Sequence, residues 1–249
     1  MELKNKPPDI PLGRATMSSG LESARNYHRW NFEWIEPYVC GRILDIGGGT
    51  GNHLAFLKHA EIISIDLSSK AVDELRTHHR DVPNWSFEAG DITDPDLVAR
   101  FGLASFDTVL SCNVFEHILN DTVAFAHAAE LLRPAGHLVL LLPAHPWLFG
   151  SMDRLAGHFR RYTRNDAGSK LAAAGLEIVT LRYVNLVGAL GWFVNNRLVA
   201  HRDLSSPAIN RQIQLFDRLL IPVLKRLEGK RHMPIGQSLV CVGRKPRIG

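Results

Sequence analysis

The residues with the clearest chemical meaning are three glycines spaced two apart, in the segment Asp45-Ile-Gly47-Gly-Gly49-Thr-Gly51. They follow an apolar run and precede a predicted helix over residues 52–59. Glycine has no side chain, so glycines at this spacing let the backbone turn sharply and approach a bound ligand closely. Asp45 places a carboxylate ahead of the turn, which repels a pyrophosphate and attracts a cationic group. The segment therefore predicts a binding turn for a positively charged ligand.

The glycine spacing argues against a dinucleotide as that ligand. Dinucleotide sites need a GxGxxG pattern, whereas the sixth position is Asn52 when counted from Gly47 and Leu54 when counted from Gly49. S-adenosylmethionine (SAM) has a sulfonium group, an ammonium group and no phosphate, so an acidic, glycine-lined turn suits it. The segment resembles the first motif, (D/E)xGxGxG, of the class I SAM-dependent methyltransferases. The resemblance implies SAM as the cofactor and S-adenosylhomocysteine (SAH) as the product.

Later segments resemble further landmarks of that family in the same order. Asp66 ends the second predicted strand, where the family's carboxylate holds both ribose hydroxyls, and Leu67 follows it. Asp91 and Ile92 follow the third strand, where the family's aspartate bonds the adenine amino group and the next residue packs on the ring. Asn113 begins NVFEHI, which is similar to the family's NVLEHI segment beside the methyl group and methionine moiety. The resemblance implies that all five residues bind the cofactor.

Two other segments complete this resemblance, which covers residues 40–145. The run Leu132-Arg-Pro-Ala-Gly136 resembles the family's LxPGG turn before the fifth strand, and we expect Gly136 to shape the turn without touching the ligand. Tyr27 and Arg29 belong to a predicted N-terminal helix. By analogy with family N-termini, we expect them to cover the methionine end of SAM, with Tyr27 as a cofactor contact.

The acceptor is expected at the long loop after the fifth strand, residues 144–162, because ligands of open α/β sheets bind beyond the carboxyl ends of the strands. The loop resembles a GSxDxxxGHxRRYT segment of bacterial methyltransferases from glycan or secondary-metabolite pathways. We predict substrate contacts by Trp147, Arg160, Arg161 and Tyr162. Guanidinium forks match carboxylates and phosphates, which favours an anionic small-molecule acceptor.

Two histidines are candidate general bases. His117 and His158 can each take a proton from an oxygen or nitrogen nucleophile near neutral pH. The alternative roles are structural: a histidine near a helix N-cap such as Thr163 can hold the fold, and the loop arginines can pair with Asp153 or Asp166. The sequence leaves both possibilities open.

The sequence does not predict a metal site. His117, His145 and His158 are the histidines that could share an ion, but no ligand spacing links them, so we expect no metal. The three cysteines are far apart and in no CxxC spacing, which indicates neither a zinc cluster nor a disulfide framework. Free cysteines fit a reducing cytoplasm.

Alternating strand and helix patterns must position these residues. Seven β-rich runs are predicted strands: 42–46, 61–67, 84–89, 106–112, 137–143, 176–184 and 238–244. The alternation predicts an α/β fold with a Rossmann-like, doubly wound, mostly parallel seven-stranded sheet. The fifth run, LVLLLP, is apolar at consecutive positions, as in a strand buried on both faces.

One domain over residues 19–249 accounts for the length and the 45% hydrophobic content. We divide it into a helical cap (19–38), a core (40–185 and 236–246) and a helical insert (186–235), after a mobile lead at 1–18. A helix at 163–174 precedes the sixth strand. No apolar leader or membrane-spanning run is evident, which predicts a soluble cytoplasmic protein.

The insert is predicted as helices at 186–199 and 207–228, the second interrupted at Pro222. A helical wheel of the second places Arg211, Arg218 and Lys225 opposite one apolar stripe. The stripe consists of Ile209, Ile213, Phe216, Leu220, Val223 and Leu227. We expect it to pack on its own domain or on a second subunit, in a monomer or homodimer, and to roof the substrate pocket. The alternative is contact with a membrane surface.

Charge is concentrated in the last part of the chain. Residues 197–249 have 11 Lys and Arg against 3 Asp and Glu, within a net charge of +4. Such a segment is either a solvated face or a surface that attracts nucleic acid, anionic lipid or an acidic substrate. The fourth strand lacks the (N/D)PP(Y/F) signature that base-amine methyltransferases use, which disfavours nucleic acid.

The predicted reaction is an in-line displacement in which an oxygen, nitrogen or carbon nucleophile of a biosynthetic small molecule attacks the sulfonium methyl. SAM is already activated, so the protein mainly supplies alignment and desolvation. Three alternatives remain open at this point: a SAM-binding protein without activity or a regulatory subunit, a methyltransferase for a lipid-linked substrate, and one for nucleic acid.

Overall fold

The computed structural model describes residues 23–57, 61–194, 196, 207–229 and 233–247, so the predicted mobile lead lies outside the described residues. The strands are β1 (Arg42–Ile46), β2 (Glu61–Asp66), β3 (Trp85–Ala89), β4 (Phe106–Cys112), β5 (Leu132–Pro143), β6 (Glu177–Val184) and β7 (Ser238–Arg244). They form one sheet in the order β3-β2-β1-β4-β5-β7-β6, in which β7 is antiparallel to both neighbours and the other pairs are parallel. The predicted mostly parallel seven-stranded sheet is confirmed.

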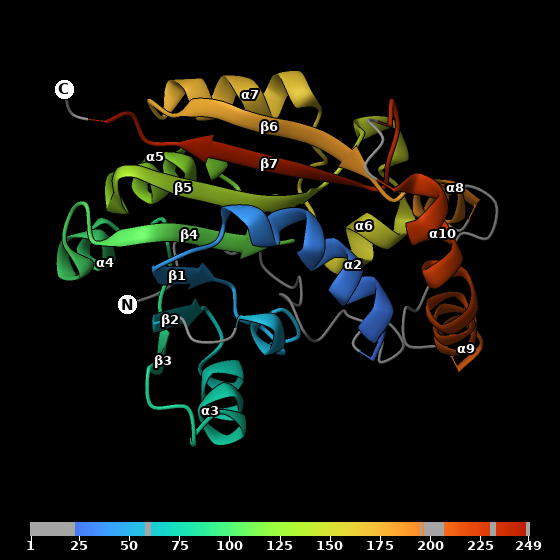
Figure 1. The fold of residues 1–249 in the computed structure, drawn as a ribbon, viewed down its shortest axis with the longest axis horizontal. Helices are drawn as coiled ribbons and strands as arrows, with labels where there is room; N and C mark the ends of the chain where they lie inside the picture. The colour runs from blue at the N-terminus through green and yellow to red at the C-terminus, as the bar shows by residue number, and fades with distance from the viewer. Residues whose placement is uncertain (1–22, 58–60, 195, 197–206, 230–232, 248–249) are drawn as a thin grey trace.

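Helices cover both faces of this sheet (Figure 1). The α-helices are α2 (Arg25–Ile35), α3 (Ser69–His78), α4 (Pro95–Phe101), α5 (Asp121–Leu131), α6 (Ser151–Ala156), α7 (Arg164–Ala173), α8 (Leu186–Val194), α9 (Pro207–Leu215) and α10 (Ile221–Glu228). Short 3-10 turns are η2 (Glu36–Tyr38), η3 (Leu54–Phe56), η4 (Phe115–His117) and η5 (Pro146–Leu148). Thr163 caps α7 by accepting a hydrogen bond from the Asp166 amide, which explains why that helix begins where the sequence predicted.

Strand β5 shows why a consecutive apolar run belongs in the centre of the sheet. Leu138 and Leu140 pack into the core on one face, whereas Val139 and Leu141 pack into the core on the other. Because successive side chains of a strand point to opposite faces, both must be apolar when helices cover both. The predicted burial of this strand on two faces is confirmed.

The helix predicted over residues 52–59 is wrong in the described part of that segment. Only the single turn η3 forms, and residues 58–60 lie outside the described residues. Gly51 has a φ of +74°, and the backbone leaves helical geometry again at Leu57, where ψ is 79°. Too few residues lie between these two points to nucleate a stable helix.

In the insert, a π-helical turn, η7 (Phe216–Leu220), joins α9 to α10 where the sequence predicted an interruption at Pro222. Pro222 lies in the first turn of α10, where its missing amide hydrogen costs little. Leu220, Val223 and Leu227 of the apolar stripe are 48%, 49% and 67% exposed, so this part of the stripe does not pack on its own domain, and its contact with a second subunit stays a prediction.

Instead of that stripe, α10 and η7 face inward with two carboxylates and one isoleucine. Asp217 accepts hydrogen bonds from the amides of Asn26 and Tyr27, and Glu228 accepts one from the amide of Leu186. The two acids therefore cap the first turns of α2 and α8, where unpaired amides and the helix dipole favour negative charge. Ile221, 1% exposed, lies between them in the sequence.

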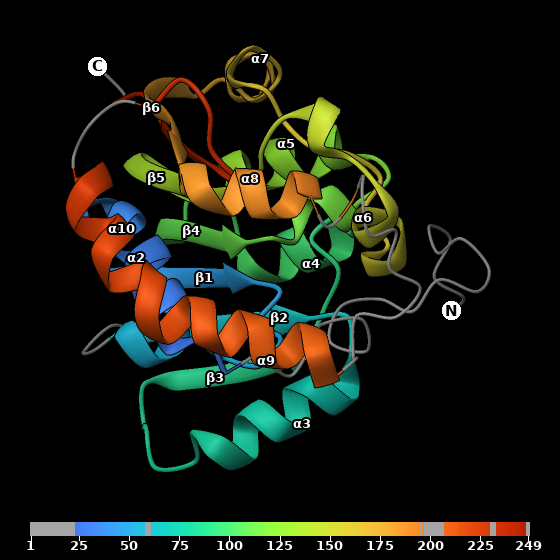
Figure 2. The same ribbon diagram turned by 90° about the vertical axis from the view of Figure 1, so that its right-hand side faces the viewer.

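These helices lie at the carboxyl ends of the parallel strands. In Figure 1 the arrowheads of β1 and β4 point toward the side that holds α8, α9 and α10, and Figure 2 shows these helices in front of the sheet edge. Strand order reverses between β1 and β4, and that is where ligands of open α/β sheets bind.

Candidate functional site

The glycine turn lies at the carboxyl end of β1 and has the backbone that only glycine adopts readily. The φ angles of Gly47, Gly49 and Gly51 are +79°, +53° and +74°. A Cβ on Gly47 would lie 2.3 Å from a methyl of Val114, whereas a Cβ on Gly49 would meet no atom of the described residues closer than 3.8 Å. Gly47 thus permits close packing of two loops, and Gly49 borders open space that a ligand can enter.

Asp45 lies beneath this turn and is fully buried. Its carboxylate accepts a hydrogen bond from the Ser64 hydroxyl at 2.6 Å, and its other oxygen lies 2.6 Å from Nε2 of His53. Both carboxylate oxygens of Asp45 thus have partners inside the protein, and the ligand contact predicted for this residue stays a prediction. The sequence did not indicate the pairing with His53.

His53 gives the turn a pH dependence. Burial disfavours its imidazolium form, but the charge of Asp45 and the hydrogen bond to it outweigh burial and raise the pKa of His53 above its ordinary value of 6.5. A raised pKa means that the folded protein holds this proton more tightly than the unfolded chain. The stabilisation is complete below the ordinary pKa and is lost as the pH rises through the raised one.

We therefore expect His53→Gln to lower the free energy of unfolding more at about pH 6 than at about pH 9. Urea titrations of both proteins at the two pH values measure this difference. His78→Gln is the matched control, because His78 is exposed on α3 and forms a hydrogen bond with the Glu74 carbonyl of the same helix. Equal losses at both pH values for His53→Gln would contradict the ion pair.

The acidic residues after β2 and β3 lie on the same edge of the sheet as the turn. Asp66 accepts hydrogen bonds from the amides of Gly49 at 3.0 Å and Ser68 at 2.8 Å, so it ties β2 to the glycine turn. Asp91 accepts from the amide and hydroxyl of Thr93. Both carboxylates remain half-buried and partly accessible. A glycine turn with open space, flanked by accessible carboxylates, fits a ligand with ribose hydroxyls, an amino group and net positive charge.

The apolar residues next to these acids differ in exposure. Leu67 is 46% exposed and Ile92 is 2% exposed. A side chain as accessible as that of Leu67 can cover a ligand ring, whereas Ile92 belongs to the core and offers almost no surface. The contacts predicted for both residues stay predictions.

The N-terminal helix reaches the same edge. The hydroxyl of Tyr27 forms hydrogen bonds with the side chains of Asn31 and Ser238, and the latter residue begins β7. Burial raises the pKa of Tyr27 despite these hydrogen bonds. The Arg29 guanidinium lies 4.3 Å from the centre of the Phe56 ring, which anchors α2 on the segment after the glycine turn. Helix α2 thus lies beside the expected methionine end of the cofactor.

Asn113, after β4, has a left-handed backbone with a φ of +55°, and its amide donates to the Leu141 carbonyl. Non-glycine residues in this conformation are uncommon and are often found at functional sites. It brings the NVFEHI segment across the sheet edge beside Gly47, as the proximity of Val114 to that glycine shows.

The long loop after β5 is organised by Asp153, which the sequence analysis mentioned only as a possible partner of the arginines. Asp153 is fully buried and accepts hydrogen bonds from Arg161 Nε at 2.7 Å, His158 Nδ1 at 3.0 Å and the Gly150 amide at 2.9 Å. Burial alone would raise the pKa of Asp153, but the His158 hydrogen bond and the Arg161 charge lower it to about 2. Trp192 of α8 also donates to it, at 3.2 Å, so the insert is anchored on the same carboxylate.

Of the four predicted substrate residues, two belong to the interior of the protein. Arg161 is 4% exposed and is held by Asp153 and the Ala144 carbonyl, and Tyr162 is fully buried and donates to Asp121 at 2.7 Å. These partners hold both side chains inside the protein, and for Arg161 this is the pairing with Asp153 that the sequence left open. The substrate contacts predicted for both residues stay predictions.

The other two predicted substrate residues are accessible. Arg160 is paired with Asp121 and donates to the Leu119 carbonyl, with a quarter of its side chain exposed. Trp147 is 46% exposed, and its ring centre lies 6.0 Å from that of Phe193 on α8. The substrate contacts predicted for both residues stay predictions.

The two candidate bases come together with a third group that the sequence analysis did not select. Glu116, His117 and His158 each offer a ligand atom, and these atoms lie within 4.8 Å of one another. Nε2 of His158 lies 3.8 Å from Oε1 of Glu116, and the two imidazole centres are 4.7 Å apart. His145 belongs to a different cluster, with its ring centre 4.1 Å from that of Tyr183. We call the first three residues the Glu116 cluster.

Burial dominates the electrostatics of the Glu116 cluster. Glu116 is fully buried, which raises its pKa to about 7 although the charges of His158 and Arg161 oppose the rise. Burial and the nearby His158 lower the pKa of His117 to about 3. Burial disfavours the charged form of a carboxyl and of an imidazole alike.

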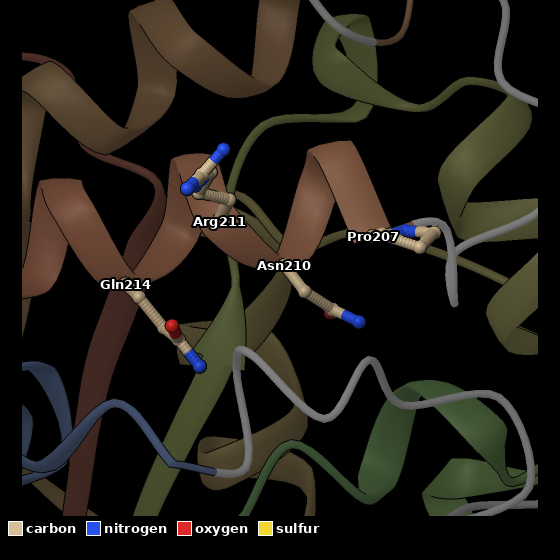
Figure 3. Close-up of a pocket in the computed structure, with 4 residues that line it drawn as sticks. All are labelled: Pro207, Asn210, Arg211 and Gln214. Atoms are coloured by element: carbon tan, nitrogen blue, oxygen red, sulfur yellow. The ribbon is translucent and has the colours of Figure 1, made fainter.

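A separate hollow of about 500 Å³ lies along α9 and is lined by Pro207, Asn210, Arg211 and Gln214 (Figure 3). All four lining residues come from this one helix of the insert, so the hollow shares no lining residue with the glycine turn or the Glu116 cluster. Among the helices of the described residues, none has the length and apolar character needed to cross a membrane.

Comparisons with known proteins agree with this geometry. Residues 20–181 match the methyltransferase domain family. The chain is 34% identical over 120 residues to an O-methyltransferase of Penicillium expansum, an alignment that covers 45% of this chain and 42% of that relative. The chain thus spans less than half the length of this curated relative.

Solved structures share the fold over nearly the whole chain. A methyltransferase in complex with the Trm112 activator of Haloferax volcanii superposes with a TM-score of 0.63 at 17% identity, covering 92% of this chain and 93% of that one. A SAM-dependent methyltransferase of Mesorhizobium loti gives 0.59 at 18% identity, covering 90% and 100%. At these identities the likeness shows the fold alone, but the family match extends over most of the sequence. The chain belongs to the methyltransferase domain family and has the class I SAM-dependent fold.

Proposed function

We propose that this protein transfers the methyl group of SAM to a nucleophile of a small-molecule acceptor, with oxygen as the favoured atom. The observation that supports this most is the hydrogen bond between Asp66 and the Gly49 amide, which holds an accessible carboxylate beside open space at the carboxyl end of β1. Similarity to the Penicillium expansum O-methyltransferase supports an oxygen acceptor.

In the proposed site the glycine turn and the carboxylates after β2 and β3 bind SAM. A lone pair of the acceptor oxygen forms the new bond to the methyl carbon, the bond from that carbon to sulfur breaks, and its electrons stay on sulfur to give SAH. The acceptor proton leaves at the Glu116 cluster, which follows β4 next to the turn. Helices α2 and α8 cover the site and exclude water, which strengthens electrostatic interactions inside it.

Trp147 and Arg160 contact the acceptor in this proposal. Trp147 offers an exposed apolar surface, and Arg160 keeps its charge close to the loop while pairing with Asp121. An acceptor with an aromatic or apolar body and a negative group would match both side chains.

Binding of SAH tests the cofactor part of the proposal. We expect calorimetry to show one SAH per chain, and we expect Asp66→Ala to weaken it by about 10- to 100-fold, because charge-assisted hydrogen bonds contribute roughly 1.5–3 kcal/mol. Asp94→Ala is the matched control, since Asp94 also accepts an amide hydrogen bond after a strand but caps α4. Absence of SAH binding by the unaltered protein would overturn the proposal.

A further inference from the structure

We propose that Glu116, His117 and His158 bind one divalent transition-metal ion beside the SAM methyl group. The site is built from two segments, since Glu116 and His117 lie in η4 after β4 and His158 lies in the loop after β5. The segments are joined directly, because the Phe159 amide donates to the Glu116 carbonyl at 2.8 Å.

Two residues of the Glu116 cluster, Glu116 and His117, have buried polar atoms that lack hydrogen-bond partners among the described residues. Within the described part of the chain, neither carboxylate oxygen of Glu116 has a hydrogen-bond partner outside its own residue, and Nδ1 of His117 has none. These three atoms are buried, and an unsatisfied buried polar atom has a substantial free-energy cost. Nε2 of His158 lies 3.8 Å from Glu116, beyond hydrogen-bonding distance but close to the separation of two ligands on one ion.

A metal held about 2.0–2.2 Å from each ligand places neighbouring donor atoms roughly 3–3.5 Å apart. The three ligand atoms of the cluster already lie within 4.8 Å of one another. Small rotations of three side chains would therefore bring them to bonding positions around a common centre.

Both imidazoles are held by their surroundings in the manner typical of metal-bound histidines. Nδ1 of His158 is bonded to the Asp153 carboxylate at 3.0 Å, and the ring of His117 makes a hydrogen bond with the backbone of Gly157. A histidine ligand usually donates its other ring nitrogen to a carboxylate or backbone carbonyl, which fixes the ring and its tautomer. Asp153 is itself fixed by Arg161, so the orientation is built into the fold.

The ligand set decides the class of metal. Two imidazoles and one carboxylate suit zinc, iron, cobalt or nickel, whereas magnesium and calcium prefer oxygen ligands. The single buried carboxylate and the ion would leave a net positive charge at the centre. This charge attracts an acceptor oxygen and favours its deprotonated form.

The role of the ion in activating the acceptor rests on the proposed function. The metal site itself does not depend on that function. An acceptor hydroxyl bound to the ion would lose its proton more readily, and the proton would pass to the Glu116 oxygen that does not hold the ion. The lone pair of the deprotonated oxygen would then point at the sulfonium methyl. The two histidines would then act as ligands, and no free imidazole would be needed as the base.

Metal binding to the tag-free, chelator-treated full chain tests the inference. We expect calorimetry with Zn²⁺ to show one ion per chain, and Co²⁺ to give visible absorption bands of a nitrogen- and oxygen-ligated ion. Glu116→Gln and His158→Ala should each weaken Zn²⁺ binding by about 100-fold or more, beyond the roughly 10–100-fold effect of losing a residue that only orients a ligand. His78→Ala should leave binding unchanged, since this histidine is exposed on α3.

Glu116→Gln keeps the shape of the side chain and removes a buried charge, so this variant is expected to fold. Failure of Zn²⁺ to bind the unaltered chain would overturn the site, and so would Zn²⁺ binding by Glu116→Gln and His158→Ala that is as tight as that of the unaltered chain. Undiminished methyl transfer by the chelated protein would overturn its role in the reaction. SAH binding separates the two proposals, because a chain that binds SAH and no metal refutes only this inference.

Discussion

Replacing Asp153 with alanine is expected to lower the free energy of unfolding by about 3–5 kcal/mol. The substitution removes the carboxylate that accepts hydrogen bonds from His158, Arg161 and Trp192. Arg161 is 4% exposed, so its charge would remain buried without a partner, and this accounts for most of the loss. Urea unfolding of the variant and the unaltered protein measures the change.

Asp73→Ala provides the control for a carboxylate paired on the surface. Asp73 binds Arg76 one helical turn away, and its side chain is 72% exposed. Such a pair contributes about 0–1 kcal/mol. A loss for Asp153→Ala no larger than that for Asp73→Ala would show that Asp153 does not organise the loop.

Replacing Gly49 with valine is expected to weaken SAH binding by about 100-fold, or about 2.7 kcal/mol. The new side chain would project into the space beside the glycine turn, where no atom of the described residues lies closer than 3.8 Å to an added Cβ. A side chain that overlaps the position of a ligand is expected to reduce the binding free energy by about 1–3 kcal/mol or more, as overpacking does in a protein core. Calorimetry with SAH gives the two dissociation constants.

Gly175→Val matches the backbone strain of Gly49→Val without touching the site. Gly175 has a φ of +74°, and an added Cβ there meets no atom of the part of the chain that the structure describes within 4 Å, but it lies between α7 and β6. Both variants lose about 1–2 kcal/mol of stability from the left-handed backbone. Only Gly49→Val should bind SAH more weakly than the unaltered protein. Equal SAH affinity in the two variants would show that the cofactor does not bind at this turn.

The sheet could be predicted because its signals are local. β1, β4 and β7 have the bounds predicted from their apolar runs, since each run is flanked by residues that end a strand. The insert could not be predicted in the same detail. Its apolar stripe indicated packing on the same domain or on a second subunit, but the amides at the starts of α2 and α8 need carboxylates, so Asp217 and Glu228 face inward.

The site also contains residues whose position could be predicted from the sequence and residues whose position could not. The residues of the cofactor site end or directly follow a strand: the glycine turn follows β1, Asp66 ends β2 and Asp91 follows β3. Their position at one edge therefore follows from the parallel order of these strands. Arg161 and Tyr162 were predicted as substrate contacts from their residue types and from their place in the loop after the fifth strand. Their burial depends on Asp153 and Asp121, and sequence spacing does not encode such pairings.

The sequence by itself determined the fold and the cofactor turn, because strand periodicity and the freedom of glycine to adopt positive φ act over a few residues. Tertiary structure decided which side chains share a site. Glu116 and His158 are far apart in the chain and meet only because β4 and β5 are adjacent and send their following loops to the same edge. The Glu116 carboxylate is buried, with no hydrogen-bond partner outside its own residue in the described part of the chain, and this arises only when the loop after β5 packs against η4.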